Sequence, residues 1–252
     1  RLDTETRTFQ AQFRSRVWSG ELHAFSVDTV TGALSANPVW SAGALMDATA
    51  WTSRNIKAAN ETGTALVNFT TDADGLSATQ KGKLGGTDAT MYVNYLRGER
   101  VNEETESGTG TLRTRTSILG DIVNSTPLFI GAPNAALHAG RSYAGGATYA
   151  AWAADASRRN RTPIVYVGAN DGMLHAFNAN TGAEVFAFVP NTVIDNGLLN
   201  YTDPLYEHRF FVDGETAAAE IYDTAINNWR TVLVGSLGRG GPGIFALDVT
   251  NP

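Results

Sequence analysis

The sequence contains no cysteine, only three lysines and no hydrophobic run long enough to cross a membrane. Without cysteine, the chain has no disulfide framework, no thiolate metal site and no cysteine nucleophile. A transmembrane helix needs about 18 consecutive apolar residues, so we expect no membrane span. The net charge of −6 argues against a broad basic face for nucleic acid.

Glycine is abundant, with 26 residues, and 42% of the 252 residues are hydrophobic. Many glycines suit a fold with many tight turns, and the apolar content is sufficient for a packed core. The chain begins with Arg1 rather than methionine and carries no signal peptide. It stops at Pro252, just after a segment that is predicted to form a strand. We therefore expect a fragment cut at both ends, with any targeting signal outside it.

The most informative stretch predicts three short strands joined by two tight turns. Strand-like Val165–Val167 leads to Asn170-Asp171-Gly172, and Asp-Gly is a strong hairpin turn pair because Gly accepts positive φ. The return strand Met173–Phe177 stops at Asn180-Thr181-Gly182, and a third strand spans 184–189. This pattern is typical of an antiparallel β-meander.

Parts of the unit recur elsewhere in the chain. Leu22-His-Ala-Phe25 matches Leu174-His-Ala-Phe177, and each is followed by a Thr-Gly turn. Val232–Gly235 resembles Val165–Gly168, and Gly243–Asp248 then occupies the place of Gly172–Phe177. Repetition of one supersecondary unit favours a propeller over the alternative of a single Greek-key sandwich. We predict an all-β chain forming a partial β-propeller of meander blades, about four of them, within one domain over 1–252.

Helical insertions interrupt the strands at about 47–98 and at 146–159. Ser77 is placed to cap a short helix that ends at Leu84, before two glycines. Asp88 is a good N-cap residue for a second helix over Ala89–Arg97, with Gly98 after its last turn. Further strands are predicted at 118–119, 122–123, 128–130, 210–212 and 217–222.

The polar residues favour structural roles over catalysis. His23 and His175 occupy matching strand positions without a second metal ligand at useful spacing, so we expect hydrogen bonds to backbone at a blade edge. His208 also lacks a base–nucleophile arrangement. Asp171 and Asp213 each precede Gly, which predicts turn residues that cap backbone N–H groups. We predict no catalytic and no cofactor-binding residues.

Two other motifs also have simple structural explanations. The glycine-rich segment Gly235–Gly243 lacks the Gly-Lys-Ser/Thr of a phosphate-binding loop, which favours a hairpin loop. The five tryptophans favour packing between blades over a sugar-binding platform.

Asp72 and Asp74 are the only candidate metal ligands that the sequence suggests. Asp72-Ala-Asp-Gly75 has two carboxylates and a glycine, as a calcium loop does. The segment lacks the third ligand pair and the bidentate Glu at the twelfth position. A turn explains it better.

Long motifs across nearly the whole chain, in the same order, resemble the PilC/PilY family of type IV pilus proteins. They are Val93–Gly98, Leu119–Pro127, Val165–Phe177, Trp229–Gly235, Gly240-Gly241 and Ala246–Thr250. The resemblance is to the C-terminal β-propeller domain of these large surface proteins, of which this chain would be the N-terminal portion.

The resemblance implies a non-enzymatic module for pilus biogenesis, retraction control, twitching motility and cell adhesion. It implies a place at the bacterial cell surface or pilus tip, reached through the periplasm and outer membrane. The implied partners are minor pilins, assembly proteins and a host or abiotic surface ligand. Some family members respond to Ca²⁺ through an Asp-rich loop, which is expected beyond Pro252.

The alternative is a PQQ-like quinoprotein dehydrogenase, because propellers of that class use similar Asp-Gly and Thr-Gly repeats. Such an enzyme needs an acidic base and Ca²⁺ at the propeller axis, and often a vicinal cysteine pair. The sequence offers no cysteine and no Asp/Glu/Asn set that can be placed at an axis. The long pilus-type motifs favour the pilus module over the dehydrogenase.

Overall fold

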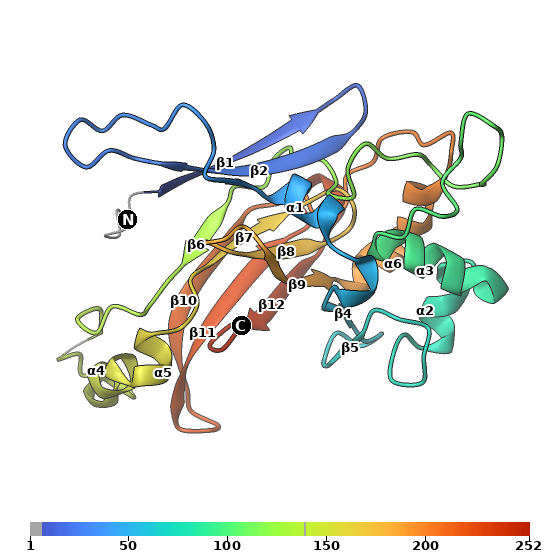
Figure 1. Cartoon of the computed structure of the whole chain (residues 1–252). Coiled ribbons are helices and arrows are strands. Elements are labelled where there is room, and N and C mark those ends of the chain that lie inside the picture. The colour runs from blue at the N-terminus through green and yellow to red at the C-terminus, as the bar shows by residue number, and fades with distance from the viewer. Residues whose placement is uncertain (1–6, 139) are drawn as a thin grey trace.

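The computed structural model describes residues 7–138 and 140–252, whose strands form three sheets packed face to face (Figure 1). The first sheet comprises β1 (Arg7–Arg14), β2 (Ser19–Ser26) and β3 (Trp40–Ser41). The third comprises β10 (Thr216–Asp223), β11 (Asn228–Ser236) and β12 (Ile244–Asp248). The central sheet has the order β5-β4-β9-β8-β7-β6. Its strands are β4 (Ile56–Ala59), β5 (Leu66–Asn68), β6 (Leu128–Ile130), β7 (Ile164–Gly168), β8 (Leu174–Asn178) and β9 (Glu184–Val189).

Among the described residues, the helices within 78–97 and 146–159 lie in the predicted insertions, whereas the helices at 42–48 and 191–195 are not predicted. The helices are α1 (Ala42–Ala48), α2 (Ala78–Lys83), α3 (Ala89–Arg97), α4 (Gly146–Ala154), α5 (Ala156–Arg159) and α6 (Asn191–Asp195). Short 3₁₀ turns are η1 (Trp51–Ser53), η2 (Gly86–Asp88), η3 (Leu198–Thr202) and η4 (Gly238–Gly240). No helix in the described part of the chain combines the length and apolarity that crossing a bilayer requires.

The predicted helix ends are confirmed except for one cap. Ser77 forms a capping box with Gln80 at the start of α2, which satisfies two N–H groups of the first turn. Gly98 ends α3 in the left-handed conformation. Asp88, however, makes no side-chain cap bond, because the 3₁₀ turn η2 runs directly into the helix and replaces the extended N-cap geometry.

The central meander is confirmed. β7, β8 and β9 are antiparallel neighbours, and Gly172 adopts a φ of +91° in the turn between the first two. All five residues of β7 are buried, because other sheets cover both of its faces. Val165, Val167 and Phe177 pack toward the first sheet, whereas Ile164, Tyr166 and Leu174 belong to the core shared with the third sheet.

The sheets stack in a repeating manner, as expected for a propeller. β2 presents Leu22 and Ala24 to the central sheet, and β8 presents the matching Leu174 and Ala176 to the third. The sequence match between β7 and β11 is wrong by one residue. Val249 N–H donates to the Thr231 carbonyl at 2.8 Å as Ala179 N–H donates to that of Pro163 at 2.9 Å, so Val232 corresponds to Ile164.

Three expectations about strands are also wrong. We expected about four blades, but the described residues form three sheets because β4 pairs in parallel with β9 and joins the central sheet. Residues 118–123 form no strand, and only Gly120 makes an isolated bridge, to Ser19. Residues 210–212 are also irregular. Gly120 and Phe211 donate their N–H groups to the side chains of Asp171 and Asn170 instead.

Candidate functional site

Three Asp–Gly pairs from distant parts of the sequence meet at one end of the sheets. They are Gly120-Asp121, Asp171-Gly172 and Asp213-Gly214. Glycine allows the close approach, since a Cβ on Gly120 would lie 2.3 Å from the backbone nitrogen of Asp171. The carboxylates of all three aspartates are buried against backbone N–H groups and polar side chains.

The segment Leu119–Ser125 hydrogen-bonds to the central sheet. Gly120 N–H donates to Asp171 Oδ2 at 2.9 Å, and Gly168 N–H donates to Ser125 Oγ at 2.9 Å. Asn170 donates its N–H to the Asp121 carbonyl at 2.9 Å and its Nδ2 to Asp121 Oδ2 at 2.7 Å. These bonds take the place of a regular strand ladder.

The same segment also reaches the chain that enters the third sheet. Asn124 donates to Asp213 from its backbone N–H at 3.1 Å and from Nδ2 at 2.6 Å. Asn170 Oδ1 accepts the N–H of Phe211 at 3.0 Å. The prediction that Asp213 binds a backbone N–H is confirmed, but that N–H belongs to Asn124 across the sheets and not to its own turn. The segment fixes the two sheets relative to each other.

Asp121 is fully buried and contacts His208 on the surface side. Its Oδ2 lies 2.8 Å from His208 Nε2, while Oδ1 has no hydrogen-bond partner among the described residues. The His208 ring stacks on Trp18 with centroids 3.6 Å apart. Trp18 has a φ of +50°, a strained value for a bulky residue. The stack therefore holds the turn between β1 and β2 against the segment before β10.

His175 connects two buried carboxylates beneath this cluster. Its Nε2 lies 3.0 Å from Asp171 Oδ2, and its Nδ1 lies 2.8 Å from Glu184 Oε1. Both contacts are hydrogen bonds only when both ring nitrogens carry protons, which makes the ring an imidazolium. The predicted backbone partner at a blade edge is wrong, since β8 lies inside the sheet and His175 is fully buried.

Arg54 completes a charge-balanced group with His175, Asp171 and Glu184. Its Nε and Nη2 donate to the two oxygens of Glu184 at 2.6 and 2.8 Å, in the bidentate geometry that favours Arg–carboxylate pairs. Its Nη1 donates to the carbonyl of Arg97, the last residue of α3, at 2.8 Å. The group therefore joins the helical insertion to the central sheet.

The neighbours of these groups shift their pKa values against the effect of burial. Burial alone would lower the pKa of His175, but Asp171 and Glu184 raise it to about 9. Burial alone would raise the pKa of Glu184, but Arg54 and His175 lower it to about 2. Both groups are therefore charged at neutral pH, as the hydrogen-bond geometry requires.

The contribution of His175 to stability should disappear in mild alkali. Its folded-state pKa of about 9 exceeds the unfolded value of 6.5, so the contribution is complete below pH 6.5 and is lost as pH rises through 9. The shift corresponds to about 3 kcal/mol. We expect the difference in unfolding free energy between the native protein and His175→Gln to shrink by about that amount between pH 6 and 10 in urea titrations. A constant difference would contradict a charged His175.

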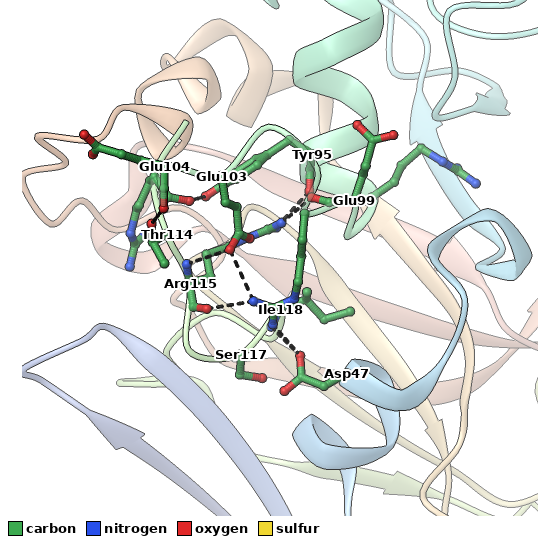
Figure 2. A network of polar contacts seen from close by, with 12 residues as sticks. Asp47, Tyr95, Glu99, Glu103, Glu104, Thr114, Arg115, Ser117 and Ile118 are labelled. Atoms are coloured by element: carbon green, nitrogen blue, oxygen red, sulfur yellow. Dashed lines mark hydrogen bonds and ion pairs between the residues drawn. The ribbon is translucent and has the colours of Figure 1, made fainter. Parts of the chain in front are cut away.

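A second polar network supports the segment from the side of the insertion (Figure 2). Arg115 donates from Nη1 to the Tyr95 carbonyl at 2.8 Å and from Nη2 to the Glu99 carbonyl at 2.7 Å, so it satisfies acceptors at the end of α3. Its Nε donates to Glu103 Oε1 at 2.7 Å. The guanidinium also lies 3.6 Å from the centroid of the Tyr95 ring, whose pKa burial raises to about 12.

This network extends to α1 through Arg100. Arg100 bonds Glu103 Oε2 at 3.3 Å and Asp47 Oδ1 at 3.0 Å. Asp47 Oδ1 also accepts the N–H of Ile118 at 2.8 Å, immediately before the Leu119–Ser125 segment. Two helices and a loop therefore determine where that segment enters the site (Figure 2).

The remaining residues named from the sequence lie elsewhere. Asp72 and Asp74 are exposed in a turn, where Asp74 Oδ2 accepts from Asn68 Nδ2 at 2.6 Å. His23 bonds Ser41 Oγ at 2.8 Å rather than backbone. Within residues 7–138 and 140–252, no three His, Cys, Asp or Glu side chains are grouped as metal ligands.

Comparison with known proteins gives one family match. Residues 119–252 match the family model described as the PilY1 beta-propeller domain. The chain is 52% identical over all 252 residues to the type IV pilus biogenesis factor PilY1 homolog of Xylella fastidiosa, covering 19% of that protein. It is 35% identical, over 97% of the chain and 21% of the relative, to the type IV pilus biogenesis factor PilY1 of Pseudomonas aeruginosa strain UCBPP-PA14. The chain thus spans about a fifth of these relatives. No solved structure matches it.

Proposed function

Because this chain belongs to the PilY1 beta-propeller family, we propose that it is a propeller module of a type IV pilus biogenesis factor and acts through protein contacts. The observation that carries the proposal is the 52% identity over the whole chain to a protein named for that role. The matched region begins at Leu119, so it includes the segment that fixes the sheets relative to each other. In this proposal the segment maintains the geometry of a binding scaffold.

The polar site supports a scaffold rather than a catalyst. Glu184, Asp171 and Asp213 are each bound by side-chain or backbone donors of this chain, so they are committed to internal contacts. His175 is fully buried between two of them. Groups held in this way stabilise the fold, which supports a binding scaffold over a catalyst.

The proposal includes surface attachment, retraction control and a location at the cell surface or pilus tip. Minor pilins and assembly proteins are its proposed partners, together with a host or abiotic surface ligand. We assign calcium binding to an Asp-rich loop outside residues 1–252. In support of that assignment, Asp72 and Asp74 lie in a turn in which Asp74 already bonds Asn68.

Deletion of the gene should strongly reduce surface pili and twitching. Sheared pili can be quantified by immunoblot and counted by electron microscopy, with the intact gene supplied in trans as the control. The Asp171→Asn allele should restore piliation wherever the protein accumulates, because no proton transfer is required of that residue. Normal piliation in the deletion strain would contradict the proposal. So would turnover of an alcohol or sugar by purified protein supplied with pyrroloquinoline quinone and Ca²⁺.

A further inference from the structure

Three loops form a continuous surface at the end of the sheets where Asp121, Asp171 and Asp213 meet. They are the turn between β1 and β2 (Arg14–Trp18), the segment Tyr206–Phe210 and the loop Leu237–Gly241 between β11 and β12. The Trp18–His208 stack joins the first two. The Arg239 guanidinium, 5.4 Å from the Phe210 ring centroid, joins the second and third. In Figure 1 this surface lies away from α4 and α5, which are at the other end of the molecule.

Exposed arginines without ion pairs gather on these loops. Arg14, Arg16, Arg209 and Arg239 are all exposed, and none forms an ion pair with a described residue. Among the described residues outside these loops, six arginines have an acidic partner. These are Arg54, Arg100, Arg115, Arg158, Arg161 and Arg230. The four arginines therefore form an exposed basic group without ion pairs in a chain whose net charge is −6.

The charge of the surface is positive despite acidic groups nearby. Glu207 is the one exposed carboxylate within the three loops, against four guanidinium groups. Asp121 and Asp213 lie beneath the loops but are buried: Asp213 accepts from Asn124, and Asp121 contacts both Asn170 and His208. The exposed guanidinium groups are the charges that an approaching partner can contact directly.

The chemistry of the surface favours carboxylates presented on a peptide. Guanidinium forks bind carboxylates in bidentate pairs, and spaced arginines suit spaced acidic side chains. The three aromatic rings of these loops are already engaged: Trp18 stacks on His208, Tyr206 lies 4.2 Å from the Arg113 guanidinium, and Phe210 contacts His208, at 4.8 Å, and Arg239. These contacts count against a sugar-binding platform, which uses open ring faces.

We propose that this surface, formed by Arg14, Arg16, Arg209 and Arg239, docks an acidic peptide segment of a protein partner. The inference rests on the proposed function, since it gives the chemical class of the partner in a module that acts through protein contacts. Electrostatic complementarity of this kind speeds encounter and fixes orientation.

The test uses the protein purified at its natural length and fluorescein-labelled deca-glutamate as the probe, followed by fluorescence anisotropy. The double variant Arg16→Glu/Arg209→Glu should bind the probe at least about tenfold more weakly than the native protein. The matched control is Arg141→Glu/Arg159→Glu, which makes the same charge change on two exposed, unpaired arginines near α4 and α5. That control should change affinity less than twofold, and both variants should keep the native melting temperature.

Several outcomes would overturn the inference. These are no binding of deca-glutamate by the native protein at low salt, or equal weakening in both variants, which would show a response to net charge alone. Tighter binding of a heparin oligosaccharide, lost in the same variant, would assign the surface to carbohydrate instead. The piliation phenotype of the deletion strain is scored independently, so failure of this surface and failure of the proposed function are distinguishable.

Discussion

Arg54→Ala should destabilise the domain by about 3–5 kcal/mol, the usual cost of removing one partner from a buried ion pair. The substitution leaves Glu184 buried with two acceptor oxygens that lose charge-assisted donors at 2.6 and 2.8 Å. It also removes the bond to the Arg97 carbonyl that ties α3 to the central sheet. Urea unfolding monitored by tryptophan fluorescence measures the loss.

Two further variants separate the buried charge from simple loss of a side chain. Arg54→Met combined with Glu184→Gln should be clearly more stable than Arg54→Met alone, because no uncompensated carboxylate remains. Lys83→Ala breaks the Lys83–Asp195 pair, which is equally short at 2.6 Å but solvent-exposed, and should cost less than about 1 kcal/mol. Similar losses in Arg54→Ala and Lys83→Ala would contradict the importance of burial.

The elements that the sequence predicted well are those determined by neighbouring residues. The Asp171-Gly172 hairpin, the α2 cap at Ser77 and the end of α3 at Gly98 all depend on turn and cap chemistry within a few positions. Residues 118–123 resemble a strand locally but form none. The N–H groups of Ile118 and Gly120 donate to side chains 71 and 51 positions away. Local propensity contains no information about those contacts.

The candidate site was missed for the same reason. In the sequence, Asp121, Asp171 and Asp213 are isolated loop or turn residues, and the distances between them cannot be derived from it. One signal was present: each aspartate adjoins a glycine in a long motif, and glycine permits backbones of adjacent sheets to approach closely. The bidentate pairing of Arg54 with Glu184 has no such signal, since it joins the helical insertion to β9 across 130 positions.

Gly120→Ala should disrupt the site from within and destabilise the domain by about 3–5 kcal/mol. The added methyl group would lie 2.3 Å from Asp171 N and 2.8 Å from its Cβ, and backbone cannot move aside as a flexible side chain can. Overpacking typically costs about 1–3 kcal/mol. Displacing Gly120 also breaks its N–H bond to Asp171 Oδ2, which adds about 1.5–3 kcal/mol for a charged acceptor.

Gly82→Ala is the matched control, because the same methyl group meets nothing within 4 Å on the exposed side of α2. In a helix interior, Ala is favoured over Gly by about 0.5–1 kcal/mol, so this variant should be slightly more stable than the native protein. Urea unfolding of the two variants side by side tests the contrast. Native stability in Gly120→Ala would mean that the sheets do not meet as tightly at Asp171 as the structure requires. The role of Leu119–Ser125 in fixing the sheets relative to each other would then be lost.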